Sequence, residues 1–447
     1  MSSSSTALSA SPSIQWAIIG LGDVCTIKSG PAFYKSHGSR LIAVMRRSPG
    51  VAQQWVADNQ KMIQRYNNDN GMSNEKQVDT IRGYDDITKM VKENIQELDA
   101  IYIATPPGAH LENVRQILSA FDEATTSTSS TTETADNSSS TKQPPPRLKA
   151  IYVEKPCGRT AWETRTMIDE LHHRNIQFYP AYVSRAHERT QVLRKLLQST
   201  NSSIIGDRVT RVQYTQRGSS FARGLDDDGE GIPWRLRAEY SGGGLLMDMG
   251  CHVLDRIDYL FGPIVDVQSE AFRKGGDVQG GDYGKYPLVE DYVEMNGKIG
   301  QCDWAVIPSE GAVVECLWDF SPPGTQEKEG VKSDEDELII TGTNGSLRMA
   351  GMGAGLPIEV LDVDGNVMET IEFEAPMHAA QPLIQSIVNE LRGIERDDTL
   401  EHCLVKSPAR AENAVRTSEV LDAILNSYYG GRHDEFWTRP ESWPGLK

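Results

Sequence analysis

The stretch QWAIIGLGDVC at residues 15–25 decides how the first half of the chain folds. Gln15 to Ile19 is a short, nearly continuous apolar run, which is typical of a buried strand in a parallel sheet. It leads into Gly20-Leu21-Gly22, and a plausible helix follows through Tyr34. In this order, the glycines let the backbone approach a pyrophosphate, and the helix N-terminus supplies N–H donors. The stretch therefore predicts a Rossmann dinucleotide-binding domain.

The glycine loop and its neighbours supply the first predicted cofactor contacts. Cys25 stands where a third small residue is usual, and it is small enough to keep the helix close to the strand. The contacts that we expect in this loop are Gly20, Gly22, Asp23, Val24 and, through its charge, Lys28. The alternative is a structural strand-to-helix turn that binds nothing.

The end of the second predicted strand, residues 41–45, bears on the choice between NAD and NADP. A domain that binds NAD usually ends this strand with an acid, which holds the ribose hydroxyls. Arg46 and Arg47 stand there instead. Because a guanidinium pairs bidentately with a phosphate, these residues favour NADP over NAD. The alternative is a pair of solvated arginines that open a loop.

Two further predicted strands end in residues suited to a ligand site. Residues 99–104 run into Thr105-Pro106-Pro107, with His110 beside this turn, and residues 149–153 run into Glu154-Lys155-Pro156. In a parallel sheet, ligands bind at the carboxyl ends of the strands. Lys155 is thus placed to donate to a substrate hydroxyl and to stabilise a developing alkoxide. The alternatives are a solvent-facing histidine and a Glu–Lys pair on the surface.

The stretch GGGLLMDMGCH at residues 242–252 carries a second candidate site. If the segment after the glycines is helical, Asp248 and His252 lie one turn apart on the same face. A carboxylate beside a titratable imidazole suits proton transfer at a substrate hydroxyl. Trp234 and Arg235, just before this stretch, could cover a nicotinamide or a phosphate, or could simply pack. The alternative for the whole stretch is a helix start with a satisfied histidine.

The remaining patterns predict the domain organisation. Residues 1–13 read as a disordered leader, and residues 14–183 as the Rossmann domain, with a disordered, low-complexity insertion at about 122–147. Residues 184–430 hold consecutive strand-like runs with hairpin signals at 343–346 and 362–366. They predict an α+β domain with an open, mostly antiparallel sheet. Residues 431–447 read as a polar surface tail. The fold class is α/β followed by α+β.

Composition limits the partners. The formal net charge of −18 argues against binding nucleic acid or an anionic membrane. The 6 cysteines show neither C-x-x-C spacing nor a zinc pattern, so we expect no metal and reduced thiols in the cytoplasm. No apolar run is long enough to span a bilayer.

Taken together, the motifs resemble those of the Gfo/Idh/MocA oxidoreductases, the glucose–fructose oxidoreductase and inositol dehydrogenase family. The glycine loop is generic, but E-K-P followed by G-G-G-x-x-x-D-x-G-x-H is specific to that family, and the resemblance runs from about residue 14 to 427. It implies that Lys155, Asp248 and His252 line the substrate site. It also implies that the cofactor contacts include Gly20, Gly22, Arg46, Thr105, Pro106, His110 and Glu154. Cys25 and Arg46 depart from the usual pattern, and Arg46, where NAD-dependent members have Asp, supports NADP.

The resemblance implies a hydride transfer between NADP and a secondary alcohol of a sugar, cyclitol or related polyol. His252 would take or return the hydroxyl proton, Lys155 would donate to the same oxygen, and Asp248 would hold a neighbouring hydroxyl. A homodimer or homotetramer is expected, because relatives cover the open sheet by self-association. The alternatives are a non-catalytic sensor that binds dinucleotide and ligand, and a dihydrodiol-type dehydrogenase.

Overall fold

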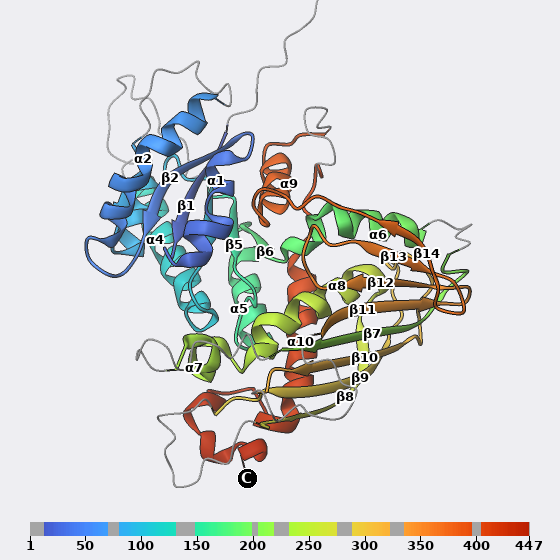
Figure 1. Cartoon of the computed structure of the whole chain (residues 1–447). Helices are drawn as coiled ribbons and strands as arrows, with labels where there is room; N and C mark the ends of the chain where they lie inside the picture. The colour runs from blue at the N-terminus through green and yellow to red at the C-terminus, as the bar shows by residue number, and fades with distance from the viewer. Residues whose placement is uncertain are drawn as a thin grey trace, which may run out of the picture. The chain divides into compact units, whose positions relative to one another are not determined.

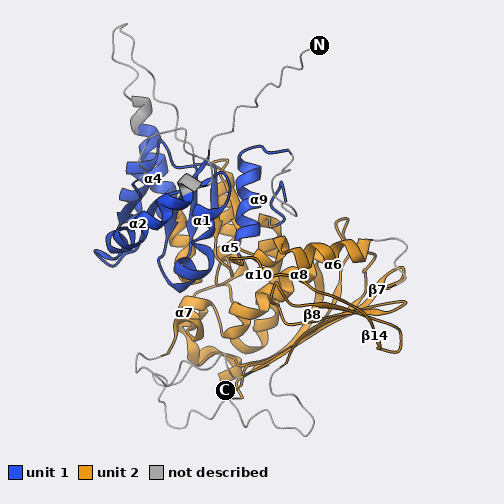
Figure 2. Cartoon of the chain, turned by 45° about the horizontal axis from the view of Figure 1, so that its top comes forward, with its two compact units in different colours: residues 1–104, 116–151, 380–408 blue, residues 105–115, 152–379, 409–447 orange. Residues whose placement is uncertain are grey.

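The computed structural model describes residues 13–69, 80–130, 148–198, 204–218, 232–274, 288–321, 335–395 and 404–446. By compactness the chain divides into two units, which Figure 2 colours separately: residues 1–104, 116–151 and 380–408, and residues 105–115, 152–379 and 409–447. This division does not follow the predicted boundary at residue 183, which lies just after the last strand of the first sheet. That boundary stays a prediction.

The first sheet has six strands in the order β3-β2-β1-β4-β5-β6 (Figure 1). Strand β1 (Ile14–Ile19) pairs in parallel with β2 (Ser39–Met45) on one side and β4 (Ala100–Ile103) on the other. The remaining strands are β3 (Arg82–Tyr84), β5 (Ala150–Val153) and β6 (Gln177–Pro180). This is the strand order of a Rossmann fold, so the α/β prediction is confirmed.

The connections of this sheet follow from local signals. Gly20, directly after β1, has a φ of 101°, a conformation that favours glycine. It leads through a π-helical turn (Val24–Ser29) into the short helix α1 (Ala32–Lys35). Helix α2 spans Val51–Asp69, and α3 (Ile87–Asn94) begins where the Asp86 carboxylate accepts a hydrogen bond from the backbone of Lys89 at 2.7 Å. Helix α5 spans Ala161–His172.

The predicted low-complexity insertion begins later than expected. Helix α4 runs from His110 to Ser130, so the prediction of disorder from about residue 122 is wrong for residues 122–130. The hydroxyls of Thr125 and Thr126 donate to the carbonyl of Asp122 at 2.8 and 2.9 Å, which accommodates these residues within the helix. Residues 131–147 of the predicted insertion and residues 1–12 of the leader lie outside the described residues.

The second sheet has eight strands in the order β14-β13-β12-β11-β7-β10-β9-β8 (Figure 1). Every neighbouring pair is antiparallel except β7 with β10, which confirms the predicted mostly antiparallel sheet. The strands are β7 (Val209–Arg217), β8 (Ile264–Phe272), β9 (Tyr292–Ile299), β10 (Val313–Asp319), β11 (Glu335–Gly342), β12 (Ser346–Ala350), β13 (Ile358–Leu361) and β14 (Val367–Ile371).

The strands of this sheet alternate buried and exposed side chains, as in β9, so one face of the sheet is covered. Helix α10 (Ala411–Tyr429) packs on β8 and on α8 (Cys251–Phe261). Helices α6 (Glu188–Gln198) and α7 (Ala238–Ser241) belong to the second compact unit, and α9 (Gln381–Leu391) belongs to the first.

Most of residues 431–446 are exposed or half-buried, as expected of a surface segment, but a few buried side chains anchor this C-terminal segment. Phe436 and Trp443 are buried, and their rings pack against Tyr429 at centroid distances of 4.9 and 4.6 Å. The indole N–H of Trp443 donates to the carbonyl of Phe436 at 2.8 Å. The sequence analysis did not predict this anchoring, which arises because α10 ends in the aromatic pair Tyr428 and Tyr429 and the segment buries two of its rings against Tyr429.

Candidate functional site

The glycine run at residues 242–244 forms the turn between α7 and α8. Gly242 ends α7 with a φ of 87°, where a side chain would be strained. At Gly244 a Cβ atom would lie 2.2 Å from the carbonyl oxygen of Glu290, and the Gly244 N–H donates to the Glu290 carboxylate at 2.9 Å. The chain then enters a π-helical turn (Leu246–Gly250) that continues into α8. The segment after the glycines is therefore helical, as predicted.

Lys155 and Asp248 form the centre of the site, and both belong to the second compact unit. The Lys155 Nζ donates to Asp248 Oδ1 at 2.7 Å and to the backbone oxygen of Asp248 at 2.9 Å. The two side chains keep 16% and 22% of their surface exposed. Because an ammonium has three N–H donors, one donor of Lys155 remains for a ligand.

Arg235 is a third charged member of this cluster. Its Nε lies 3.2 Å from Asp248 Oδ2, and its guanidinium lies 4.5 Å from the centre of the Trp234 ring. We expected Trp234 and Arg235 to contact the cofactor. In the structure Arg235 pairs with the carboxylate of the candidate substrate site, and its contact with the cofactor stays a prediction. No sequence pattern predicted that Arg235 pairs with Asp248, because Arg235 lies in the turn Trp234–Leu236 and Asp248 in the separate turn Leu246–Gly250.

The opposite charges of the cluster stabilise one another's ionised forms. Burial is the largest single influence on the pKa of Lys155 and lowers it, but the charge and hydrogen bond of Asp248, together with Cys251 and Glu154, outweigh burial and raise this pKa. Burial alone would raise the pKa of Asp248, but the positive charges of Lys155 and Arg235 lower it. The ammonium and the carboxylate are therefore both charged at neutral pH.

His252 follows in the first turn of α8. Burial, followed by the positive charge of Lys155, lowers the pKa of His252 well below 6.5, so the imidazole is neutral at neutral pH. Within the part of the chain that the structure describes, its ring nitrogens have no hydrogen-bond partner. A neutral imidazole offers one N–H donor and one lone pair. The cluster thus combines a cationic donor with a neutral proton acceptor, which is what chemistry at a hydroxyl or carbonyl needs.

His110 is buried rather than facing solvent, so that alternative is wrong. Its ring nitrogens lie 2.8 Å from the carbonyl oxygen of Cys157 and 2.6 Å from that of Thr105. The ring therefore ties the turn after β4 to the loop after β5. A hydrogen bond from His110 to a cofactor would have to replace one of these two, so the ring is better placed to hold the loops together than to bind a cofactor.

The other predicted contacts lie as follows. Thr105 accepts a hydrogen bond from Asn113 at 2.9 Å through its hydroxyl, and Pro106 follows it, half-buried. The Glu154 carboxylate accepts from the backbone N–H of Lys155 at 3.2 Å. In the first unit, Asp23, Lys28 and Arg47 are exposed, and Val24 is half-buried.

The glycine loop has room for a phosphate against its backbone. A Cβ atom added at Gly22 would meet no heavy atom within 4 Å. The exposed Arg46 reaches this loop, where its Nη1 donates to the carbonyl of Leu21 at 2.5 Å. The loop and Arg46 therefore fit a dinucleotide with a phosphate close to the guanidinium.

Replacing Gly22 with valine should weaken dinucleotide binding by about tenfold or more while leaving the melting temperature nearly unchanged. The added Cβ atom meets no heavy atom within 4 Å, so the substitution should cost little in the free protein, but the side chain would occupy the space that a pyrophosphate needs. Fluorescence titration with NADPH measures the affinity for the dinucleotide, and thermal denaturation measures the melting temperature. Gly365→Val, at a turn where φ is 83°, should show the reverse: a lower melting temperature and unchanged binding.

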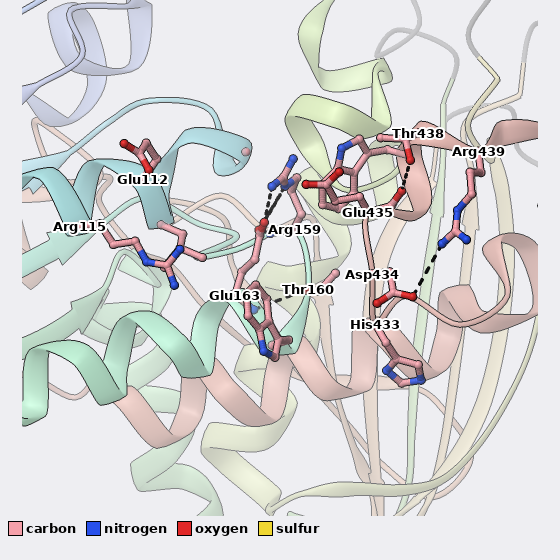
Figure 3. A pocket seen from close by; sticks show the side chains of 14 residues that line it. Glu112, Arg115, Arg159, Thr160, Glu163, His433, Asp434, Glu435, Thr438 and Arg439 are labelled. Atoms are coloured by element: carbon pink, nitrogen blue, oxygen red, sulfur yellow. Dashed lines mark hydrogen bonds and ion pairs between the residues drawn. The ribbon is translucent and has the colours of Figure 1, made fainter.

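A cavity of about 860 Å³ lies elsewhere in the second unit (Figure 3). The first turns of α4 and α5 and residues 433–439 line it. The Arg159 guanidinium lies 3.6 Å from the centre of the Trp437 ring, and its Nε donates to Glu163 at 2.9 Å. None of the predicted site residues lines this cavity, and no motif in the sequence indicated it.

Comparison with known proteins identifies the family. Residues 14–123 match the oxidoreductase family with an NAD-binding Rossmann fold, and residues 205–348 match the GFO/IDH/MocA C-terminal domain. The oxidoreductase P35 of Formosa agariphila is 23% identical over 421 residues, which cover 93% of this chain and 99% of the relative.

Solved structures share the fold over nearly the whole chain. The aldose–aldose oxidoreductase of Caulobacter crescentus, complexed with glycerol, is 18% identical with a TM-score of 0.61, covering 93% of this chain and 97% of that one. The WlbA dehydrogenase of Bordetella pertussis, in complex with NADH and UDP-GlcNAcA, is 16% identical with a TM-score of 0.59, covering 93% and 96%. The matches to both domains, in the order that the motifs predicted, show that the chain belongs to the Gfo/Idh/MocA family of NAD-binding oxidoreductases.

Proposed function

We propose that this protein is an NADP-dependent oxidoreductase that transfers a hydride between NADP(H) and a secondary alcohol or ketone of a sugar, cyclitol or related polyol. The observation that carries the proposal is the Lys155–Asp248 pair, joined at 2.7 Å, in which the ammonium keeps one donor for a substrate oxygen. Membership of an NAD-binding oxidoreductase family supports the reaction class. The aldose–aldose oxidoreductase among its structural relatives supports a sugar-like substrate.

Each residue of the cluster has a distinct role in this proposal. Lys155 donates to the reacting oxygen and stabilises negative charge that develops there. His252, neutral at neutral pH, takes the hydroxyl proton during oxidation and returns it during reduction. Asp248 holds the ammonium in place, and its remaining lone pairs can accept from a neighbouring substrate hydroxyl. The nicotinamide supplies the hydride chemistry when it is bound.

A substrate panel tests the proposal. NADPH oxidation would be followed with ketoses and inosoles, and NADP reduction with the corresponding sugars and polyols. Turnover of at least one polyhydroxylated compound is the expected result. Dinucleotide binding without any turnover across the panel would favour the sensor function, and turnover confined to aromatic dihydrodiols would favour the dihydrodiol-type dehydrogenase.

Arg46 should make the protein prefer NADP. We expect Arg46→Ser to weaken NADP binding by about 10- to 100-fold, since one charge-assisted hydrogen-bonded contact contributes about 1.5–3 kcal/mol, and to leave NAD binding nearly unchanged. Arg65→Ser, an exposed arginine on α2, is the matched control and should change neither affinity. Tighter binding of NAD than of NADP by the wild-type protein would refute the assignment.

We also propose that the protein is a cytoplasmic homodimer or homotetramer. Large apolar side chains are exposed on strands of the second sheet, at Val265, Val313, Val367 and Met368, which supports coverage by a second copy. A light-scattering mass equal to one chain at micromolar concentration would contradict this. Among the described residues, no helix is long and apolar enough to cross a membrane.

A further inference from the structure

A single buried arginine joins the two chain segments that carry the Lys155–Asp248 pair. Arg432 follows the end of α10, and only 1% of its side-chain surface is exposed. Its Nη2 donates to the carbonyl oxygen of Arg159 at 2.6 Å and also to the carbonyl oxygen of Gly242. Arg159 lies four residues after Lys155, and Gly242 lies six residues before Asp248.

The bridge lies at a point where the backbones of these two segments touch. A Cβ atom at Gly242 would be only 2.7 Å from Cα of Arg159, so the backbones are in direct contact at this point. The two carbonyl oxygens point at the same guanidinium nitrogen, and two such oxygens repel each other unless a donor lies between them. Arg432 thus offsets a repulsion that would otherwise separate the segments.

Two carboxylates extend the bridge to helix α10 and strand β9. Asp422 of α10 accepts from Nη1 of Arg432 at 2.9 Å and from the backbone N–H of Ala161, the first residue of α5, also at 2.9 Å. Next to β9, Glu290 accepts from the backbone N–H of Gly244 and from the hydroxyl of Tyr429. Both segments are therefore held at their backbones by side chains from outside the two motifs.

We propose that Arg432 is a positioning residue for the reaction: its guanidinium holds the backbones of Arg159 and Gly242 together, so that Lys155 Nζ stays within hydrogen-bonding distance of Asp248. Only the expected effect on turnover depends on the proposed function. Lys155 makes bonds of 2.7 and 2.9 Å to Asp248, and a misplacement of about 1 Å at a catalytic group can cost about 10²-fold in rate.

Lysine cannot reproduce this contact. A guanidinium is planar and presents five donors in a fixed fork, whereas an ammonium is a compact charge on a flexible stem. Arg432→Lys keeps a positive charge beside the partly exposed Asp422 carboxylate, so that carboxylate is not left unpaired. The substitution therefore removes the two-carbonyl bridge with limited cost to folding.

The first experiment compares turnover and binding in the full-length protein. Arg432→Lys should lower kcat by about 10- to 100-fold with the KM for the cofactor within about twofold. Arg439→Lys, in the same segment but with 58% of its side chain exposed, is the matched control and should behave as the wild type. A wild-type kcat in Arg432→Lys, together with a lower melting temperature, would overturn the proposal and leave Arg432 a purely structural role.

The second experiment needs no turnover. The rate at which acetic anhydride acetylates Lys155, followed by mass spectrometry, reports whether its ammonium stays paired with Asp248, because pairing suppresses the reactive free amine. In Arg432→Lys we expect Lys155 to react several-fold faster, with exposed lysines such as Lys195 unchanged. Faster acetylation without turnover on any substrate would support the positioning role while contradicting the proposed function.

A milder variant covers the case in which Arg432→Lys does not fold. Asp422 uses one carboxylate oxygen for Ala161 and the other for Arg432, so Asp422→Asn keeps an acceptor for only one of the two and removes the charge that orients the guanidinium. It should raise the acetylation rate of Lys155 in the same direction by a smaller factor. An unchanged rate in Asp422→Asn, with Arg432→Lys unfolded, would overturn the proposal.

Discussion

Replacing Lys155 with methionine should lower kcat by about 10²-fold or more while NADP binding persists. Methionine keeps the length and apolar stem of the side chain but has no N–H donor. The substrate oxygen then loses the group that stabilises its charge, and among the described residues Asp248 keeps Arg235, at 3.2 Å, as its one cationic ion-pair partner. Steady-state kinetics on a substrate from the panel, with a separate NADPH titration, measure the two quantities.

The same variant should change the pH dependence. After burial, the charge of Lys155 is the largest cause that lowers the pKa of His252. Without that charge, the pKa of His252 rises toward its ordinary value, so the acidic limb of kcat/KM should move to higher pH. Lys195→Met, an exposed lysine on α6, is the control and should leave both kcat and the pH profile unchanged. Near-normal turnover in Lys155→Met would show that the assigned role is wrong.

Replacing Arg185 with methionine should destabilise the fold by about 3–5 kcal/mol at pH 7.5, because it leaves a buried carboxylate without its partner. Arg185 and Asp255 have side-chain exposures of 1% and 0%. The guanidinium donates to both carboxylate oxygens, with Nε at 2.8 Å from Oδ2 and Nη2 at 2.7 Å from Oδ1. Asp255 lies one turn after His252 on α8, so this pair also anchors the helix that carries the site.

The loss of stability in Arg185→Met should be larger at high pH than at low pH. Burial raises the pKa of Asp255 to about 6 even with Arg185 present, whereas an unfolded aspartate titrates near 4. The folded state therefore holds the extra proton, and stability falls as the pH rises from about 4 through 6. Without Arg185 the folded pKa rises further, so the destabilisation should be smaller at pH 5 than at pH 7.5.

Urea denaturation at these two pH values measures the free energy of unfolding. Arg211→Met removes an arginine from the exposed pair with Glu315 and should cost less than about 1 kcal/mol. The double variant Arg185→Met, Asp255→Leu should recover much of the loss, because the Asp255 carboxylate is no longer left without its partner, while Asp258 keeps its pair with Arg416. A loss below about 1 kcal/mol in Arg185→Met at pH 7.5 would contradict the expectation.

Much of the fold could be predicted because its signals are local. The apolar run before Gly20, the cap at Asp86 and the hairpin turns near residues 343 and 362 each act within a few residues of chain. The anchoring of the C-terminal segment was not predictable for the complementary reason, because it depends on residues outside that segment. Phe436 and Trp443 are buried because an aromatic surface on α10 covers them, and no pattern inside the tail encodes that surface.

The candidate site divides in the same way. Helical spacing after the glycine run was enough to expect Asp248 and His252 in successive turns, and strand ends were enough to expect Lys155 at a ligand site. The choice of partners was not predictable, because Lys155 bonds to a residue 93 positions away and Arg432 to one 190 positions away.

Sequence patterns thus determined which elements form and which residue types stand at their ends, since propensity, turn chemistry and periodicity are short-range effects. The tertiary structure alone decided that Arg235 pairs with Asp248, that His110 is buried between two carbonyl oxygens, and that Arg432 bridges the two motifs. These contacts depend on distances between segments far apart in the chain, and such distances are set only when the whole core packs.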